Sequence, residues 1–203
     1  MENPENDNDI LETPRRLHPD AIVLPGFVLG VVMIVIGMVW VGILRDLNVL
    51  DEWYPRVNIA LEIGIGVVAG LMGIALVWIL SDIIPPMQRL RDELIRMIQF
   101  DELRLWHALT FGLLAGIPEE ILFRGAIQPV THVVVAAVIF GVLHAITRTY
   151  MIYAIGAGLV LGFIASWRGD LWAATTAHFT YDAGLFILMA WRFRRSAAAS
   201  IAE

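Results

Sequence analysis

The chain of 203 residues contains no cysteine and no lysine. Without cysteine it can form neither disulfides nor thiolate metal sites, and it has no thiol nucleophile. Its 14 basic residues are therefore all arginines. Phosphate-binding glycine loops, zinc-finger spacings and the H-E-x-x-H pattern of soluble metalloproteases are also absent from the sequence, which excludes the sites that those patterns build.

Apolar residues, in contrast, are abundant. A hydrophobic content of 58% and a mean hydropathy of +0.71 exceed the values of a typical soluble domain. A hydrocarbon core about 30 Å thick requires about 20 apolar residues per helix. Six runs are candidates: 21–44, 59–80, 105–130, 132–147, 150–167 and 171–191. We expect an all-α, polytopic integral membrane bundle of about six transmembrane helices, although the short fourth run leaves a five-span or re-entrant arrangement open.

The arginines are distributed unevenly along a six-span model. One side would carry Arg45, Arg56 and Arg168, and the other would carry Arg15, Arg16, Arg89, Arg91, Arg96, Arg104, Arg148, Arg192, Arg194 and Arg195. The positive-inside rule then places both termini in the cytoplasm. Absence of lysine together with many alanines and arginines is typical of a GC-rich prokaryotic genome, so we expect the plasma membrane of a prokaryote.

Three segments lie outside these runs. Residues 1–20 form an acidic, polar tail that we expect to be disordered. Residues 81–104 place apolar side chains at helical spacing between charges, which predicts an amphipathic helix on the cytoplasmic membrane surface. This helix either links two spans or takes part in substrate recognition. Residues 192–203 form a C-terminal tail.

The stretch "GIPEEILFRG", residues 116–125, places three charges inside an apolar run. Glu120 and Arg124 are four residues apart, with the glutamate on the N-terminal side, which favours a helical ion pair. Glu119 is then left without a partner. A lone carboxylate in a bilayer costs at least about 2.5 kcal/mol, so intramembrane acids are functional candidates. Pro118 removes a backbone donor just before the pair.

Other polar side chains are predicted to meet Glu119 at one depth. A turn at residues 129–132 puts Glu119 and His144 each about twelve residues from that turn, so both lie about 18 Å along their helices. His178 and Asp182 share a face of the last span, and Asp182 lies at a similar depth. The alternative is that these groups only hydrogen-bond helices together. The remaining candidates have structural interpretations: His107 and His132 as interfacial or turn residues, and Glu62 as a snorkelling or capping residue.

Three motifs resemble one known family. "EEILFR" (119–124) fits E-E-x-x-x-R, "FGVLH" (140–144) fits F-x-x-x-H, and "HFTYD" (178–182) fits H-x-x-x-N/D. Their order on separate predicted helices is similar to that in the CAAX protease and bacteriocin-processing family (CPBP), which includes the type II CAAX prenyl endopeptidases. The resemblance covers residues 105–191, which we expect to be the catalytic core.

The resemblance implies an intramembrane endopeptidase that acts near the cytoplasmic face. It assigns Glu119 as the base that activates water, His144 as its assistant, and Glu120 and Arg124 as supports. It also implies that His178 and Asp182 stabilise the oxyanion or hold a metal. Prenyl endopeptidases carry Asn where this chain has Asp182, and a carboxylate cannot donate to an oxyanion unless it is protonated. Asp182 therefore favours metal ligation or orientation of His178.

Metal and partners follow from the same resemblance. His144, His178 and Asp182 are the expected ligands of one divalent ion, with zinc the first choice, although a mechanism using glutamate and water without metal stays open. We expect a peptide or protein substrate, with or without a lipid modification, contact with membrane lipid, and no nucleic acid partner. Two other functions stay open: a non-catalytic immunity or scaffold protein with the same fold, and a small transporter with a proton relay.

Overall fold

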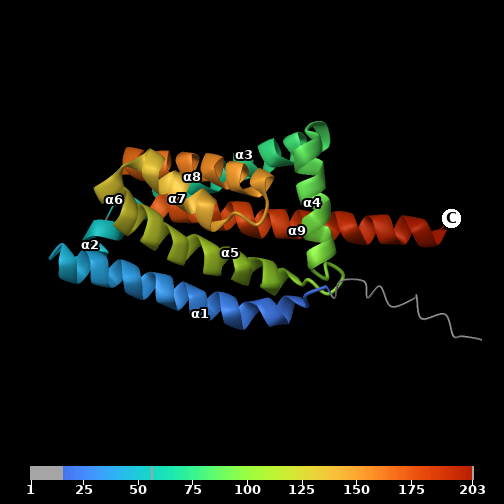
Figure 1. Ribbon diagram of the computed structural model, residues 1–203, viewed down its shortest axis with the longest axis horizontal. Helices are drawn as coiled ribbons and strands as arrows, with labels where there is room; N and C mark the ends of the chain where they lie inside the picture. The colour runs from blue at the N-terminus through green and yellow to red at the C-terminus, as the bar shows by residue number, and fades with distance from the viewer. Residues whose placement is uncertain (1–15, 56, 203) are drawn as a thin grey trace, which may run out of the picture.

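The computed structural model describes residues 16–55 and 57–202, and these residues are almost entirely helical (Figure 1). Within them, β-structure is limited to one isolated bridge between Leu17 and Ile98. The prediction of an all-α fold is therefore confirmed. Most of the predicted N-terminal tail, residues 1–15, lies outside the described residues, as do Arg15 and Arg56 of the arginine count.

Most of the long helices run along one axis, and α9 lies at the centre of the bundle. It packs against α3, α5 and α8, while α1 covers α5 and α7 packs on α8. In chain order the elements are α1 (Pro19–Met38), the π-helix η1 (Val39–Leu44), α2 (Val49–Trp53), α3 (Ile59–Ile83), α4 (Pro85–Met97), α5 (Leu105–Glu120), the π-helix η2 (Ile121–Ile127), α6 (Gln128–Thr131), α7 (Val133–Leu143), α8 (Arg148–Arg168) and α9 (Trp172–Ala202).

Within the described residues, three helical segments are individually long and apolar enough to cross a membrane: Pro19–Leu44, Ile59–Ile83 and Arg148–Arg168. Their outward faces expose large apolar side chains such as Leu24, as lipid-facing helices do. The predicted span 105–130 forms one continuous helical path through α5, η2 and α6. The number of six spans stays a prediction.

The predicted fourth span, 132–147, is not a full helical crossing. α7 has 11 residues and is thus about 16 Å long, roughly half the hydrocarbon thickness. It ends at Leu143 because His144 leaves the helical conformation, with φ of −97° and ψ of 15°. A short turn follows, and the side chain of Thr147 then caps α8 by accepting a hydrogen bond from the Tyr150 amide. His144 therefore lies in a helix-to-helix turn at the end of a short helix.

Small residues allow α9 to approach its neighbours closely. A Cβ at Gly70 of α3 would lie 2.7 Å from Cβ of Thr180, and one at Gly116 of α5 would lie 3.0 Å from the Phe179 amide nitrogen. Membrane helices that lack a large hydrophobic driving force associate through such small-residue contacts. They fix the depth and the rotation of α9, which carries two of the predicted site residues.

α4 crosses one end of the bundle, nearly at right angles to its axis (Figure 1). Of the predicted amphipathic segment 81–104, residues 85–97 form this helix, with Pro85 in its first turn and Leu90 buried, and its position on the membrane surface stays a prediction. Phe100 and Leu103 follow it and are buried in a small apolar core at the same end. α9 extends past this level, so the segment predicted as a C-terminal tail continues the helix to Ala202.

Candidate active site

Four polar residues predicted from the sequence converge between three elements. Oε2 of Glu119, near the end of α5, lies 3.8 Å from Nε2 of His144 and 3.7 Å from Nε2 of His178. On α9, Nε2 of His178 also lies 3.5 Å from Oδ2 of Asp182. Glu119 thus faces two imidazoles at distances just beyond hydrogen-bond range.

Hydrogen bonds show which ring nitrogen of each histidine carries the proton in the neutral imidazole. Nδ1 of His144 lies 2.7 Å from the Phe140 carbonyl oxygen, which can only accept, so this nitrogen carries the proton. Nδ1 of His178 likewise donates to Oε1 of Glu120 at 2.8 Å. In the neutral imidazoles both Nε2 atoms then present a lone pair toward Glu119. Such fixed tautomers are typical of histidines that accept a proton or bind a metal.

The predicted ion pair between Glu120 and Arg124 is present and fully enclosed. Nη1 of Arg124 donates to Oε1 of Glu120 at 2.9 Å, and the two side chains are 1% and 0% exposed. Nη2 of Arg124 donates to the Gly158 carbonyl oxygen at 3.1 Å, which fastens η2 to α8. The guanidinium also lies 4.7 Å from the ring centroid of Phe140, within cation–π distance. Phe140 in turn contacts His144, with ring centroids 4.3 Å apart.

The exposed fractions of the side chains distinguish the two adjacent glutamates. Glu119 is 14% exposed, and its neighbours His144 and Asp182 are 24% and 25% exposed. Glu120 is completely buried, and its Oε1 already accepts hydrogen bonds from two residues. A substrate or a water can therefore reach Glu119, whereas Glu120 is enclosed within the protein.

The donor atoms of His144, His178 and Asp182 suit a divalent metal in kind. Imidazole nitrogens and carboxylates are common zinc ligands, and both histidines have the required outer hydrogen bonds. Adjacent ligands on tetrahedral zinc lie about 3.3 Å apart, given bonds of about 2.0–2.1 Å. Among the three expected ligands, Nε2 of His178 and Oδ2 of Asp182 lie 3.5 Å apart, slightly more than that spacing. No group of three or more acidic or histidine side chains in the described part of the chain is already arranged as a metal site.

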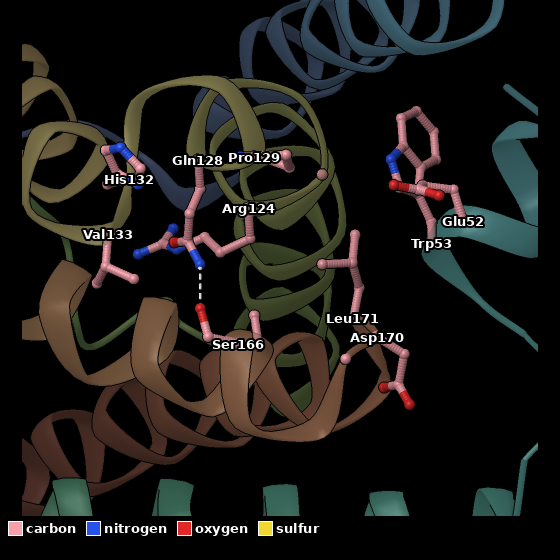
Figure 2. Close-up of a pocket in the computed structure, with 13 residues that line it drawn as sticks. Glu52, Trp53, Arg124, Gln128, Pro129, His132, Val133, Ser166, Asp170 and Leu171 are labelled. Carbon is pink, nitrogen blue, oxygen red and sulfur yellow. Dashed lines mark hydrogen bonds between the residues drawn. The ribbon is translucent and has the colours of Figure 1, made fainter. Parts of the chain in front are cut away.

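A cavity of about 350 Å³ is lined on one side by Arg124 (Figure 2). Its lining residues belong in part to α2 and α6, which lie at the end of the bundle opposite α4 (Figure 1). The side chain of Gln128 lines the cavity and donates to the Gly162 carbonyl oxygen and to Oγ of Ser166, each at 2.9 Å. Glu52 and Asp170 lie on the side away from Arg124 and His132 (Figure 2). None of the four converging residues lines this cavity, so Arg124 is the predicted site residue that it shares with the candidate active site.

The other polar candidates have structural positions. His107 is buried in the first turn of α5, where Nδ1 accepts from the Arg104 amide and Nε2 contacts Asp20 of α1. His132 is a turn residue with φ of 77°, as expected. Glu62 neither snorkels nor caps α3. It is buried and forms a two-pronged ion pair with Arg168 of α8, at 2.6 and 2.9 Å, because the start of α3 lies beside the end of α8.

Several contacts around the site could not be derived from the sequence. The hydrogen bond from His178 to Glu120 and the contact of Arg124 with Gly158 join helices whose relative rotation is not encoded in residue spacing. Phe140 belongs to a motif that was identified, yet its contact with Arg124 depends on tertiary packing. The only available signal for Gln128 was its polar character near the end of an apolar run.

Comparisons with known proteins agree with the motifs. Residues 101–184 match the family described as type II CAAX prenyl endopeptidase Rce1-like. The uncharacterized protein YpbD of Bacillus subtilis (strain 168) is 32% identical over 87 residues, which cover 41% of this chain and 46% of YpbD. The chain thus matches slightly less than half the length of this relative. No solved structure matches. The matched segment, residues 101–184, contains all six predicted site residues, so the resemblance to the type II CAAX prenyl endopeptidase Rce1-like family extends over the whole candidate active site.

Proposed function

We propose that the protein is an intramembrane endopeptidase of the CAAX-protease type, in which Glu119 activates the water that attacks a peptide bond. The family match over residues 101–184 supports a peptidase at family level. The residues that converge beside Glu119 support the chemistry. Two imidazoles and two carboxylates are sufficient for general acid–base hydrolysis of an amide.

The position of Glu119 is the observation that carries this proposal. Its Oε2 lies within 4 Å of two imidazole Nε2 atoms, and its side chain is partly accessible. A general base must reach the water that it deprotonates, and apo sites commonly hold such contacts slightly long. Glu120 has the same chemistry but is enclosed and already hydrogen-bonded. Glu119 is therefore the better base of the two.

The proposed reaction begins when Glu119 takes a proton from a water held beside His144. The resulting hydroxide attacks the carbonyl carbon of the substrate, and its C=O becomes a tetrahedral oxyanion. Collapse of this intermediate breaks the C–N bond, and the proton held by Glu119 passes to the leaving nitrogen. The products are a carboxylic acid and an amine, which exchange a proton to become a carboxylate and an ammonium group, and Glu119 returns to its ionised starting state.

The surrounding residues position this centre. Arg124 holds Glu120, and Glu120 holds the Nδ1 proton of His178, so the Nε2 of His178 faces Glu119 and Asp182. If a divalent ion such as zinc binds, His144, His178 and Asp182 would hold it, and it would polarise the substrate carbonyl and lower the pKa of bound water. The contribution of Glu119 is the same with or without the ion.

The substrate in this proposal is a peptide or protein segment that reaches the site from the cytoplasmic side of a prokaryotic plasma membrane. The arginine distribution and α4, which crosses the bundle end, support this orientation. The family description supports a prenylated C-terminus as the first substrate to assay. An identical peptide without the lipid determines whether the modification is required.

Hydrolysis by purified protein in lipid nanodiscs tests the proposal. Farnesylated and unmodified peptides ending in C-a-a-X sequences, together with a degenerate peptide library, would be incubated with the protein and analysed by mass spectrometry. Glu119→Gln should reduce the cleavage rate by at least about 10²-fold while the protein still inserts and folds. Glu102→Gln makes the same chemical change in an exposed loop and is the matched control.

Cleavage by the unchanged protein and by Glu102→Gln, but not by Glu119→Gln, supports the proposal. Near-normal cleavage by folded Glu119→Gln would show that Glu119 is not the base. Binding of peptides without any cleavage, under conditions in which a related CAAX protease is active, would instead favour the non-catalytic scaffold function.

A further inference from the structure

The candidate active site has few hydrogen-bond donors for the oxyanion that its proposed reaction would create. Both Nδ1 protons are already donated, one to the Phe140 carbonyl and one to Glu120. The two Nε2 atoms carry lone pairs in the neutral tautomers, and ionised carboxylates only accept. Peptide hydrolysis depends strongly on donors directed at the developing negative charge. With both histidines neutral, the donor must come from another residue near the four that converge.

Tyr150, in the first turn of α8, has the properties of such a donor. Its ring contacts the ring of His144 edge-on, with centroids 5.9 Å apart. Because His144 belongs to the candidate active site, this contact places the Tyr150 ring beside it. The Tyr150 hydroxyl forms no hydrogen bond with any residue that the structure describes. Its proton is thus available to a substrate.

The surroundings of Tyr150 hold its ring in place. Its amide donates to Oγ1 of Thr147 at 3.1 Å, which fixes the start of α8. Its ring is stacked on Tyr153, with centroids 6.2 Å apart and planes inclined by 14°. Tyr153 is held in turn by a hydrogen bond from its hydroxyl to Tyr181 of α9. A donor held in this way needs little reorganisation during the reaction, which is the condition for effective electrostatic stabilisation.

We propose that the hydroxyl of Tyr150 donates the hydrogen bond that stabilises the tetrahedral oxyanion, a role for which ionised Asp182 is unsuited. The inference rests on the proposed function. The phenol keeps its proton throughout, so the proton balance between Glu119 and the leaving nitrogen is unchanged. The bond forms when the carbonyl oxygen acquires negative charge, and therefore acts on the chemical step more than on substrate binding.

Tyr153 provides a matched control because it has the same ring one helical turn away, but its hydroxyl is engaged with Tyr181. Tyr150→Phe and Tyr153→Phe each remove one oxygen and keep the ring. We expect Tyr150→Phe to lower kcat by about 10²- to 10³-fold with KM changed less than about threefold, as for loss of an oxyanion donor. Tyr153→Phe should lower kcat by no more than about tenfold, because it loosens the support of the Tyr150 ring but leaves the donor in place.

Rescue by a second donor distinguishes a catalytic role from a structural one. Asp182→Asn introduces an amide that can donate, so the double variant Tyr150→Phe with Asp182→Asn should recover at least about tenfold of the lost kcat. A peptide phosphonate, which carries a tetrahedral anion, provides a measurement independent of turnover. Its affinity should fall in Tyr150→Phe by a factor similar to the fall in kcat, while the affinity for uncleaved peptide stays constant.

The outcomes separate this inference from the proposed function. If the unchanged protein cleaves peptide, Glu119→Gln does not, and folded Tyr150→Phe keeps kcat within threefold, Tyr150 is not the oxyanion donor. Equal losses in Tyr150→Phe and Tyr153→Phe, with no rescue by Asp182→Asn, would also overturn the inference. If Tyr150→Phe does not fold, Tyr150→Gln, which keeps a donor, and Tyr150→Leu, which does not, replace it. The inference fails unless folded Tyr150→Gln binds the phosphonate more tightly than Tyr150→Leu does. Failure of the unchanged protein to cleave peptide would overturn the proposed function itself.

Discussion

Nδ1 of His178 donates a 2.8 Å hydrogen bond to Oε1 of Glu120, which is 58 positions away in the sequence. The same carboxylate oxygen accepts a 2.9 Å bond from Arg124. One buried carboxylate thus connects the guanidinium of η2 to an imidazole of α9. The two adjacent glutamates therefore have different surroundings: Glu120 is enclosed between a cation and an imidazole, and Glu119 faces the accessible side.

The first prediction concerns the charge of Glu120. Glu120→Gln keeps the size of the side chain but leaves Arg124 buried without an anion, so the free energy of unfolding should fall by about 3–5 kcal/mol. Activity should fall with it. The double variant Glu120→Gln with Arg124→Gln should regain part of the stability without regaining activity. Unfolding in mixed micelles, followed by tryptophan fluorescence, measures the stability of both variants, and peptide cleavage measures their activity.

An exposed ion pair provides the comparison for this prediction. Glu52 and Arg45 lie 3.8 Å apart, and their side chains are partly exposed. Glu52→Gln should change the free energy of unfolding by less than about 1 kcal/mol. If Glu120→Gln and Glu52→Gln lower the free energy of unfolding equally, the buried Glu120–Arg124 pair is no more important for stability than the exposed pair.

The second prediction concerns the close packing of α3 on α9. A Cβ at Gly70 would lie 2.7 Å from Cβ of Thr180 and 2.8 Å from the Ala177 carbonyl oxygen, whereas one at Gly64 would meet nothing within 4 Å. Gly70→Ala should therefore destabilise the protein by about 1–3 kcal/mol and displace His178 enough to reduce activity. Gly64→Ala should be neutral, or stabilising by up to about 1 kcal/mol. Thermal unfolding of both variants checks this, and equal melting temperatures would contradict it.

The third prediction concerns metal. The donor atoms of His144, His178 and Asp182 lead us to expect one divalent ion per chain in active protein, with zinc the first choice. Elemental analysis after purification without chelators gives the stoichiometry, and His144→Ala should lower it. Protein that contains no stoichiometric metal, and whose activity survives strong chelators, would instead establish hydrolysis by glutamate and water alone.

The fourth prediction concerns topology, and it makes use of the absence of cysteine. Asp51 of α2 and Asp101 between α4 and α5 are both exposed, so Asp51→Cys and Asp101→Cys each provide a unique thiol. A membrane-impermeant maleimide should label Asp51→Cys in intact cells and Asp101→Cys only after permeabilisation. The opposite pattern would reverse the orientation and move the candidate active site to the other side of the membrane.

Local spacing in the sequence was enough to predict parts of the site. The intervals of four residues correctly joined Glu120 to Arg124 and placed Asp182 beside His178, because both pairs lie within one helix. Counting from the turn near His132 brought His144 to the depth of Glu119, and the two side chains do face one another. The catalytic roles of these residues stay predictions.

Contacts between helices could not be predicted in the same way. Spacing gives the depth of a residue but not the direction in which its helix is rotated, so the contact of His178 with Glu120 was missed. The ion pair of Glu62 with Arg168 was missed for the same reason. The length of α7 was overestimated because the apolar run continues beyond the point at which the chain turns at His144.

The π-helical segment η2 carries Arg124 and lies between α5 and α6 within one continuous helical path. A π-turn contains one residue more than the α-helical turn that it replaces. In an alignment, this segment is therefore a natural place for a gap. A homologue shorter by one residue here could keep the same helix axis with an ordinary α-helical turn, but every side chain after the gap would be rotated. In that homologue, Gln128 would no longer face Gly162. An ungapped alignment that matched its arginine to Arg124 would shift its glutamates by one position relative to Glu119 and Glu120.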